Sequence, residues 1–430
     1  MPRKTLMTPA ERVWQCGAIA IACLVLLPLG AIFWISLSPT GDVWTHLIGT
    51  VLPRSFRTTV ILMAGVGLAT TCMGIGTAWL TTMCRFPGQK HFDWALLVPL
   101  AVPTYIVAFA YVEVLDYTGP VQSLLRATFD FKTSRDYWFP EIRSLGGAAM
   151  MLVLVLYPYV YLLARAAFLQ QSGTTFLAAR ALGSSVWGAF FKVSLPLARP
   201  AIAAGVLLTV METIADFGTV SYFGVQTFAT GIYTSWFSMG DRAGAAQLAL
   251  CLLCLALVLA VIERSTRGKA RYHQAGKQHA PMPPADLKGG QAFFAWILCA
   301  LPVCFGFLLP LIILFNMGLQ SEQNLFSSRY IGFLQNSLLL ATLAALLTVM
   351  AAICLGFYQR LRPGRSSALA AYMSRLGYAV PGGVIAVGLL VPFAAFDNAL
   401  DAWMRARFDI STGLLITGLR IWRTLRPCLK

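Results

Sequence analysis

Long apolar runs recur along the whole chain, and they restrict its fold more than any other feature. Crossing a bilayer as a helix takes about 20 apolar residues, and a lone span must satisfy its backbone polar groups internally. With 58% hydrophobic residues, 12% charged residues and a mean hydropathy of +0.70, the composition is not that of a soluble globule. The sequence therefore predicts an all-α polytopic membrane protein. Spans are expected at about 16–38, 58–84, 94–116, 146–169, 201–222, 245–263, 292–318, 336–358 and 377–396, with a further start at 410–419.

The net charge of +16 raises the question of a nucleic-acid partner. The basic residues lie mainly in loops between the apolar runs, so topology signals and lipid headgroups of the bilayer explain them, and no nucleic-acid partner is expected. Lys and Arg number 19 on the side that holds the N-terminus and 10 on the other side. The positive-inside rule then predicts a cytoplasmic N-terminus.

Residues 175–202 form a basic, amphipathic segment between two apolar runs, on the predicted cytoplasmic side. Ala178, Ala179 and Arg180 favour a helix, and Gly183 is a natural C-terminal stop. A second short helix is expected from about Val186, ending before Pro196. Such a helix–glycine–helix elbow offers a surface to a soluble partner, although an amphipathic loop lying on the bilayer is the simpler alternative.

Four matches in order, at nearly constant offset, indicate an internal repeat. LLPLGAIF at 26–33 recurs as LLPLIILF at 308–315, RTTVIL at 57–62 as QNSLLL at 335–340, and RFPG at 85–88 as LRPG at 361–364. Pro103 corresponds to Pro381. The sequence predicts a tandem, parallel repeat of a six-helix unit, because six spans is an even number.

The repeat sets the predicted domains: a first unit at 1–263, a cytoplasmic basic linker at 264–290, and a second unit at 291–418. A second elbow glycine would fall near position 461, which leads to the expectation that the second unit is truncated. Residues 419–430 carry four basic residues and are expected to be an aberrant tail, with a natural short tail as the alternative.

Glu212 and Asp216 are the ionisable pair of the fifth apolar run. They are four residues apart in an apolar run, so they are expected to share one helix face. Ionisable groups inside a span usually face a water-filled cavity or the interior of a bundle. The pair is a candidate for the translocation path, and an equally weighted alternative is a structural pair bonded within the bundle.

The sequence offers no catalytic constellation. No G-x-x-x-x-G-K-[ST] phosphate loop occurs, so ATP hydrolysis would have to come from a separate subunit. Four histidines, and a Cys251/Cys254 pair within an apolar run, do not suggest a metal site. The expectation is a protein that is not an enzyme and has no cofactor.

The elbow resembles the "EAA" loop of ABC importer permease subunits, the binding-protein-dependent transport system inner-membrane components. The matching residues are Ala178-Ala179, Gly183 and Leu195-Pro196, while Leu177 replaces the usual Glu. The stretch 210–239 looks like the ferric-iron branch of these permeases. The resemblance implies an elbow that docks into a groove on a cytoplasmic ABC ATPase, two such ATPases, a periplasmic binding protein, and alternating access. It also implies that Leu177, Arg180 and the matching residues Ala178, Ala179, Gly183, Leu195 and Pro196 contact the ATPase, and that the protein lies in the inner (plasma) membrane of a bacterium.

Three alternatives stay open at this point. The chain could be an ABC permease for thiamine, sulfate or a polyamine. It could be an ion-coupled secondary transporter that uses Glu212 and Asp216. It could also be an inactive truncated product, or one that needs a second chain to supply the other half.

Overall fold

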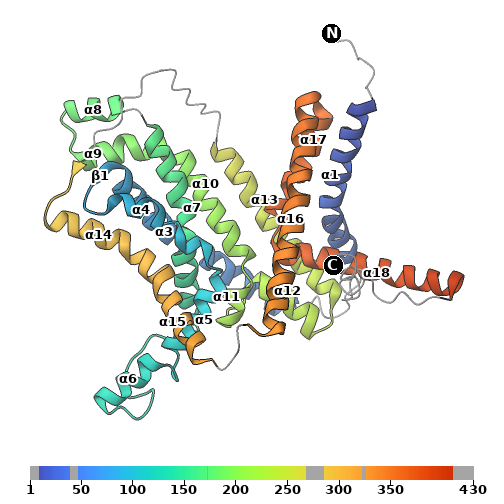
Figure 1. The fold of residues 1–430 in the computed structure, drawn as a ribbon, viewed down its shortest axis with the longest axis horizontal. Coiled ribbons are helices and arrows are strands. Elements are labelled where there is room, and N and C mark those ends of the chain that lie inside the picture. Colours follow the sequence, from blue (N-terminus) through green and yellow to red (C-terminus); the bar gives the residue numbers. More distant parts are fainter. Residues whose placement is uncertain (1–8, 39–46, 172, 268–284, 322–325, 410–430) are drawn as a thin grey trace, which may run out of the picture. The chain divides into compact units, whose positions relative to one another are not determined.

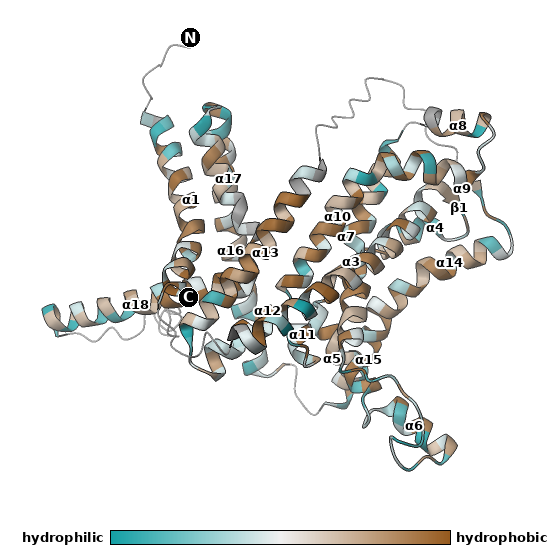
Figure 2. Cartoon of the chain, turned by 180° about the vertical axis from the view of Figure 1, so that it is seen from behind, coloured by the Kyte–Doolittle hydropathy of each residue, from teal (hydrophilic) through white to brown (hydrophobic). Residues whose placement is uncertain are grey.

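The computed structural model describes residues 9–38, 47–171, 173–267, 285–321 and 326–409. Eight of its helices are long and apolar enough to cross a membrane, and a bent helix pair gives a ninth candidate. Figure 2 shows hydrophobic residues along most of the length of the long helices, with hydrophilic residues at several helix ends. The prediction of an all-α polytopic membrane protein is confirmed. The aberrant tail and the tenth span lie outside the described residues.

The third predicted span, 94–116, is broken rather than continuous. It comprises α4 (Gln89–Ala95), the 3-10 turn η2 (Val98–Ala101) and α5 (Thr104–Leu115), and the helices that flank the break are bent by 86°. Pro103 provides the physical reason, because the residue before a proline is disfavoured in the helical region. Val102 accordingly has φ −99° and ψ 125°, an extended conformation.

The elbow and the fifth span differ from the prediction in two ways. The helix expected to end before Pro196 continues: α9 (Val186–Ala189) passes through a π-helical turn, η3 (Phe190–Ser194), into α10 (Leu195–Ala215). Pro196 is the second residue of α10, and the π-helical turn η3 directly precedes it, as expected where a proline interrupts the regular helical hydrogen bonds. The fifth span ends at Ala215, and α11 (Gly218–Tyr222) follows a break.

The chain forms two compact units, which are described separately. Unit 2 comprises residues 42–234 and 254–320, and α7 (Leu145–Gln170) is its central helix, packed between α3 (Leu52–Met83) and α10 (Figure 1). Glycines allow the close approach: a Cβ at Gly74 would lie 2.7 Å from the Cβ of Val160, and one at Gly205 would lie 2.9 Å from its Cα. The core of unit 2 is thus built around α7.

Unit 1 comprises residues 1–41, 235–253 and 321–430. In it α1 (Pro9–Ser36) packs against α16 (Ser328–Leu361), α17 (Arg365–Ala379) and α18 (Gly382–Phe408). Trp14 packs against Phe357 with ring centroids 5.0 Å apart and the rings tilted by 43°, and Glu11 pairs with Arg362 over 3.1 Å. The carbonyl of Pro28 leaves no room for a Cβ at Gly388.

The two units do not follow the order of the chain. Helix α1 lies with helices from beyond residue 321, while α14 (Gly290–Val303), η5 (Cys304–Leu308) and α15 (Leu309–Gln320) lie in unit 2. There the Tyr111 hydroxyl donates to the Phe305 carbonyl over 2.7 Å. Each unit therefore contains the first apolar span of the other predicted repeat. The repeat, with its boundaries 1–263, 264–290 and 291–418, stays a prediction about the sequence.

Candidate functional site

The elbow consists of α8 (Gly173–Ala181), a left-handed glycine and α9. Gly183 has φ +87°, and the Gly183 amide donates to the Arg180 carbonyl while the Ser184 amide donates to the Ala179 carbonyl. These two bonds form a Schellman motif, which satisfies the carbonyls at the end of the helix. Ser185 then caps α9 by accepting from the Gly188 amide over 3.0 Å. The expected stop at Gly183 is present with its full hydrogen-bonding pattern.

An aromatic cluster anchors the elbow to α3 and α7. Trp79 of α3 lies 4.3 Å from Phe190, 5.8 Å from Phe168 and 6.1 Å from Phe176, measured between ring centroids. All four side chains are buried. Trp79 is not predicted from the sequence, because an aromatic residue in an apolar run carries no signal of its own. The cluster fixes the elbow to the end of the bundle.

A second anchor is polar. The buried Gln171 side chain donates from Nε2 to the Ser194 carbonyl over 2.8 Å, so it joins the chain just before α8 to the end of η3. The role of Gln171 is not predicted from the sequence either, because its partner is 23 positions away. The aromatic cluster and the hydrogen bond between Gln171 and Ser194 together hold the elbow in one conformation.

The predicted docking residues separate into two groups. Leu177, Ala178, Arg180 and Gly183 are exposed, whereas Ala179 and Leu195 pack against the aromatic core and Pro196 is half-buried in α10. Further exposed apolar side chains, which sequence reasoning missed, extend the first group. They are Leu182, Trp187 and Phe191, with Leu182 88% exposed.

Leu177 and Arg180 line a hollow of about 210 Å³ beside α8. Its other lining residues include Trp79, Phe176 and Val186. The Leu177 side chain, at the position where the EAA pattern has Glu, is therefore an apolar part of the hollow's wall. Arg180, which lines the hollow, and Lys192 and Arg199 in the following helical turns are exposed and positively charged. We call the exposed surface of α8, α9 and η3 the elbow surface.

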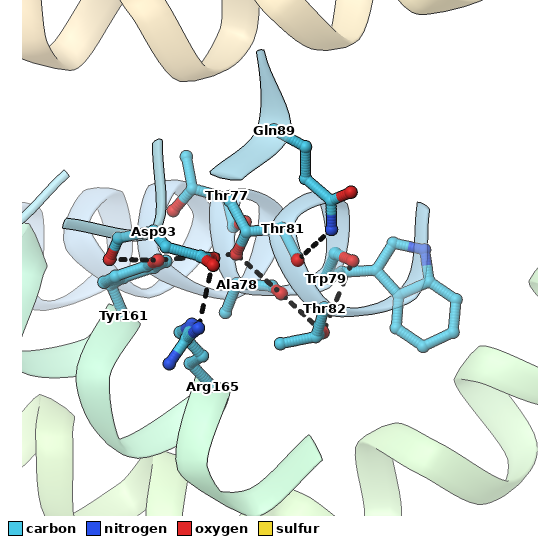
Figure 3. Close-up of polar contacts among 9 residues, drawn as sticks. All are labelled: Thr77, Ala78, Trp79, Thr81, Thr82, Gln89, Asp93, Tyr161 and Arg165. Atoms are coloured by element: carbon cyan, nitrogen blue, oxygen red, sulfur yellow. Dashed lines mark hydrogen bonds and ion pairs between the residues drawn. The ribbon is translucent and has the colours of Figure 1, made fainter. Parts of the chain in front are cut away.

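A polar network connects α3, α4 and α7 near the elbow (Figure 3). The Arg165 guanidinium pairs with the Asp93 carboxylate over 3.1 Å, and the Tyr161 hydroxyl donates to the Asp93 carbonyl over 3.2 Å. The Thr81 hydroxyl lies 3.4 Å from that of Tyr161, and Gln89 donates to the Thr81 carbonyl over 2.5 Å. This network holds the broken third span against the helix that leads into the elbow.

The chain around 285 joins the same region. Strand β2 (Ala285–Asp286) pairs in parallel with β1 (Cys84–Arg85), and the Leu287 amide donates to the Arg85 carbonyl over 3.0 Å. The Cys84 side chain is buried at this pairing. The end of the predicted linker is thus attached to the loop after α3.

Glu212 and Asp216 do not share a continuous helix face, which corrects the sequence-based geometry. Asp216 is the C-cap of α10, with φ −66° and ψ 123°. Its carboxylate accepts from the amides of Thr219 and Val220 and from the hydroxyls of Thr104 and Thr219, all at 2.8–3.1 Å. Thr104 begins α5, so Asp216 joins the break in the fifth span to the break in the third. Glu212 remains inside α10 and half-buried.

The elbow lies in a part of the chain that matches a known protein family. Residues 70–267, which contain the elbow, match the model of the family described as "Binding-protein-dependent transport system inner membrane component". Residues 70–267 belong to this family. This permease domain covers most of unit 2, including α7, the elbow surface and the Asp216 junction.

Relatives of the permease domain carry names with different substrates. The chain is 26% identical over 350 residues to "Fe(3+)-transport system permease protein FbpB 2" of Haemophilus influenzae, covering 80% of this chain and 64% of the relative. It is 22% identical to "Ferric transport system permease protein FbpB" of Actinobacillus pleuropneumoniae, covering 95% and 61%. It is 29% identical to "Molybdenum transport system permease protein ModB" of Escherichia coli, covering 44% and 82%. The chain thus spans less than two thirds of the length of the two ferric relatives.

Proposed function

We propose that the protein is the transmembrane permease subunit of an ATP-driven ABC importer for ferric iron in a bacterial inner membrane. Iron, delivered by a periplasmic binding protein, would pass between the helices to the cytoplasm. The observation that carries the proposal is the elbow, an exposed apolar surface fixed by Trp79 and Gln171 to the helices that cross the membrane.

The elbow surface supports contact with an ABC ATPase. An exposed apolar helix with a charged rim suits a helix-in-groove interface, in which the apolar side chains enter the groove and the charges remain at its edge. Leu177, Ala178, Leu182 and Trp187 would be the central contacts, with Arg180 at the rim. One elbow would contact one ATPase, and a second elbow would serve the second ATPase.

The two ferric relatives support iron as the cargo. Their alignments cover 80% and 95% of the chain, whereas the molybdenum relative covers 44%. Likeness to the ferric relatives therefore extends well outside the permease domain. Molybdate remains the second candidate cargo, because the molybdenum relative has the highest sequence identity of these three relatives, at 29%.

We assign Glu212 to the translocation path and Asp216 to holding the path's walls. Asp216 has four hydrogen-bond donors around its carboxylate, so little of its accepting capacity is left for a cation. Glu212 lies one turn earlier on α10 and is half-buried inside an apolar span. A carboxylate in that setting is suited to a polar or charged cargo.

The test is uptake of radiolabelled ferric iron by cells that co-express the chain with an ABC ATPase and a periplasmic binding protein. Uptake should depend on the ATPase and should not be competed by excess molybdate. Uptake that persists after deletion of the ATPase would favour the ion-coupled alternative and overturn the proposal. ATPase-dependent uptake of molybdate instead of iron would keep the importer and change its cargo.

A further inference from the structure

Helix α6 (Pro120–Phe129) lies in unit 2, between the helices of the third and fourth spans, and it is amphipathic. Gln122 and Arg126 lie on one side of it, and Val121, Leu124 and Leu125 lie on the other, because residues three and four positions apart share a helix face. A surface helix of a soluble domain turns its apolar side toward the core and its polar side toward water.

In α6 this arrangement is reversed, because the polar side faces the rest of its own segment. The buried Gln122 side chain donates from Nε2 to the Leu115 carbonyl over 2.9 Å and accepts at Oε1 from the Tyr137 hydroxyl over 2.6 Å. Arg126 donates to the same hydroxyl over 3.0 Å, and its guanidinium lies 4.2 Å from the centre of the Tyr117 ring. The polar side chains of α6 thus find their partners within unit 2.

The apolar side chains lie on the outside of unit 2. Leu124 is 69% exposed, and Trp138, in the loop that follows α6, is 87% exposed. Stacked rings join the helix to this loop, with Phe131 lying 5.7 Å from Phe129 and 5.3 Å from Tyr137 between centroids. Exposed apolar groups gathered in this way mark contact with another protein or with a membrane. Tryptophan and tyrosine are enriched at the membrane–water interface.

The level of α6 along the spans favours the membrane. Asp116 directly follows α5, and its carboxylate pairs over 3.0 Å with Arg143, just before α7 begins. This ion pair places the ends of two spans at one level, at the opposite end of α7 from the elbow. The Gly119 amide donates to the Asp116 carbonyl over 2.8 Å, so the chain turns there and α6 begins at the same level.

The direction of α6 points the same way. Figure 1 shows α6 projecting sideways from the ends of α5 and α15, across the direction of α14 and α15. Helix α15 belongs to a candidate span and exposes Ile312, Phe315 and Leu319 in unit 2. Helix α5 contacts both α6 and α15, so the apolar side of α6 continues the apolar surface of the spans. A helix that leaves a bundle sideways at the level of the span ends runs along the bilayer surface.

We propose that α6 and Trp138 form an interfacial anchor on the bilayer surface opposite the elbow. The side of α6 that carries Val121, Leu124 and Leu125 inserts among phospholipid acyl chains, while Gln122 stays bonded within its segment. The contact is apolar, so it needs no particular headgroup. The anchor holds the ends of α5 and α7 at a fixed depth. The proposal depends on the membrane-protein fold and goes beyond the proposed function, because neither the cargo nor the ATPase enters it.

The experiment measures the depth of α6 in liposomes that contain the full chain. A genetically encoded fluorescent amino acid replaces Leu124, and in the matched control it replaces Ser123, an exposed neighbour about 100° around the helix. The two quenchers are phospholipids with a nitroxide near the top of the acyl chain, and iodide in the water. We expect nitroxide quenching to be several-fold stronger at Leu124 than at Ser123, and iodide quenching to be several-fold weaker.

A substitution then tests whether the apolar side chain holds the helix at this depth. With the fluorescent residue at Trp138, Leu124→Glu should reduce nitroxide quenching, whereas Ser123→Glu should leave it unchanged, because only the first change puts a charge on the inserted side. The yield in the membrane and the melting temperature in detergent show whether each variant is folded. If Leu124→Glu fails to fold, the comparison of Leu124 with Ser123 in the otherwise unsubstituted chain decides alone.

Other results would overturn the proposal. Equal quenching at Leu124 and Ser123, or stronger iodide quenching at Leu124, would place the apolar side in water. Protection of Leu124 from both quenchers would mean that a protein surface, from unit 1 or a second copy, covers α6. Iodide quenching that disappears when a periplasmic binding protein is added would assign the surface to that protein instead. Iron uptake and ATPase binding are not measured here, so the anchor and the proposed function can fail independently.

Discussion

The side-chain amide of Gln171 donates to the carbonyl of Ser194 over 2.8 Å, and both residues are buried. One hydrogen bond thus spans the elbow from the residue that follows α7 to the last residue of η3. Movement of the elbow must either carry both ends together or break this bond.

Replacing Gln171 should loosen the elbow without unfolding the bundle. Gln171→Leu leaves a buried carbonyl without this donor, at a cost of about 1–3 kcal/mol. We expect faster tryptic cleavage after Arg180 and Lys192 in inside-out vesicles. The neighbouring Gln170→Leu, at an exposed position, is the matched control and should leave the rate unchanged. Equal cleavage rates in both variants would contradict the role of the bond.

Gly183 should tolerate a side chain poorly for reasons of backbone conformation alone. No atom lies within 4 Å of an added Cβ, but φ is +87°. Gly183→Ala should cost about 1 kcal/mol and weaken ATPase co-purification, with Gly183→Asn less affected because asparagine adopts the left-handed conformation more readily. Gly65→Ala, an equally open glycine inside α3, is the control. If both alanine variants behave alike, the strained conformation is not important for docking.

Trp79 should be the most sensitive position of the aromatic cluster. Trp79→Ala removes contacts with Phe190, Phe168 and Phe176 and leaves a cavity, at about 3–5 kcal/mol. The expected result is a lower melting temperature in detergent together with loss of ATPase binding. Trp94→Ala, whose side chain is 62% exposed, should change neither.

Substitutions of Glu212 and of Asp216 should have different effects on stability and on uptake. Asp216→Ala removes an acceptor of four hydrogen bonds and should lower the melting temperature, because it disconnects α10 and α11 from α5. Glu212→Gln should leave the melting temperature unchanged and reduce uptake. A stable Asp216→Ala protein with normal uptake would show that the two breaks are held together by other contacts.

The Arg165–Asp93 pair can be tested by charge exchange. Both side chains are about one third exposed, so removing either partner should cost about 1–2 kcal/mol rather than the full penalty of a buried pair. The double variant Asp93→Arg/Arg165→Asp should recover part of that loss in a double-mutant cycle. Additive losses would mean that the two charges do not interact and that other contacts hold α4 against α7, among them the hydrogen bonds of Tyr161 to the Asp93 carbonyl and of Tyr157 to the Leu96 carbonyl.

The sequence was sufficient to predict the spans because a membrane helix requires a long apolar run. It was also sufficient to predict the helix end at Gly183, because the preference of glycine for the C-terminus of a helix depends only on neighbouring residues. The break at 102–103 was missed because an apolar run looks continuous even where Pro103 interrupts the helix. The position of Asp216 was missed because its partner Thr104 is 112 residues away. Gln171 and Trp79 could not be recognised for the same reason, since their roles depend on contacts distant in sequence.

The placement of α1 with helices from beyond residue 321 has a consequence for synthesis. Glu11 finds Arg362 only after 351 further residues have been made. At 5–20 residues per second, the ribosome needs about 20–70 s to supply them. During that interval the first span stands in the bilayer without its final neighbours, and its carboxylate must be kept at the aqueous interface. The machinery that inserts this chain must therefore keep α1 from non-native contacts until α16, α17 and α18 have been synthesised.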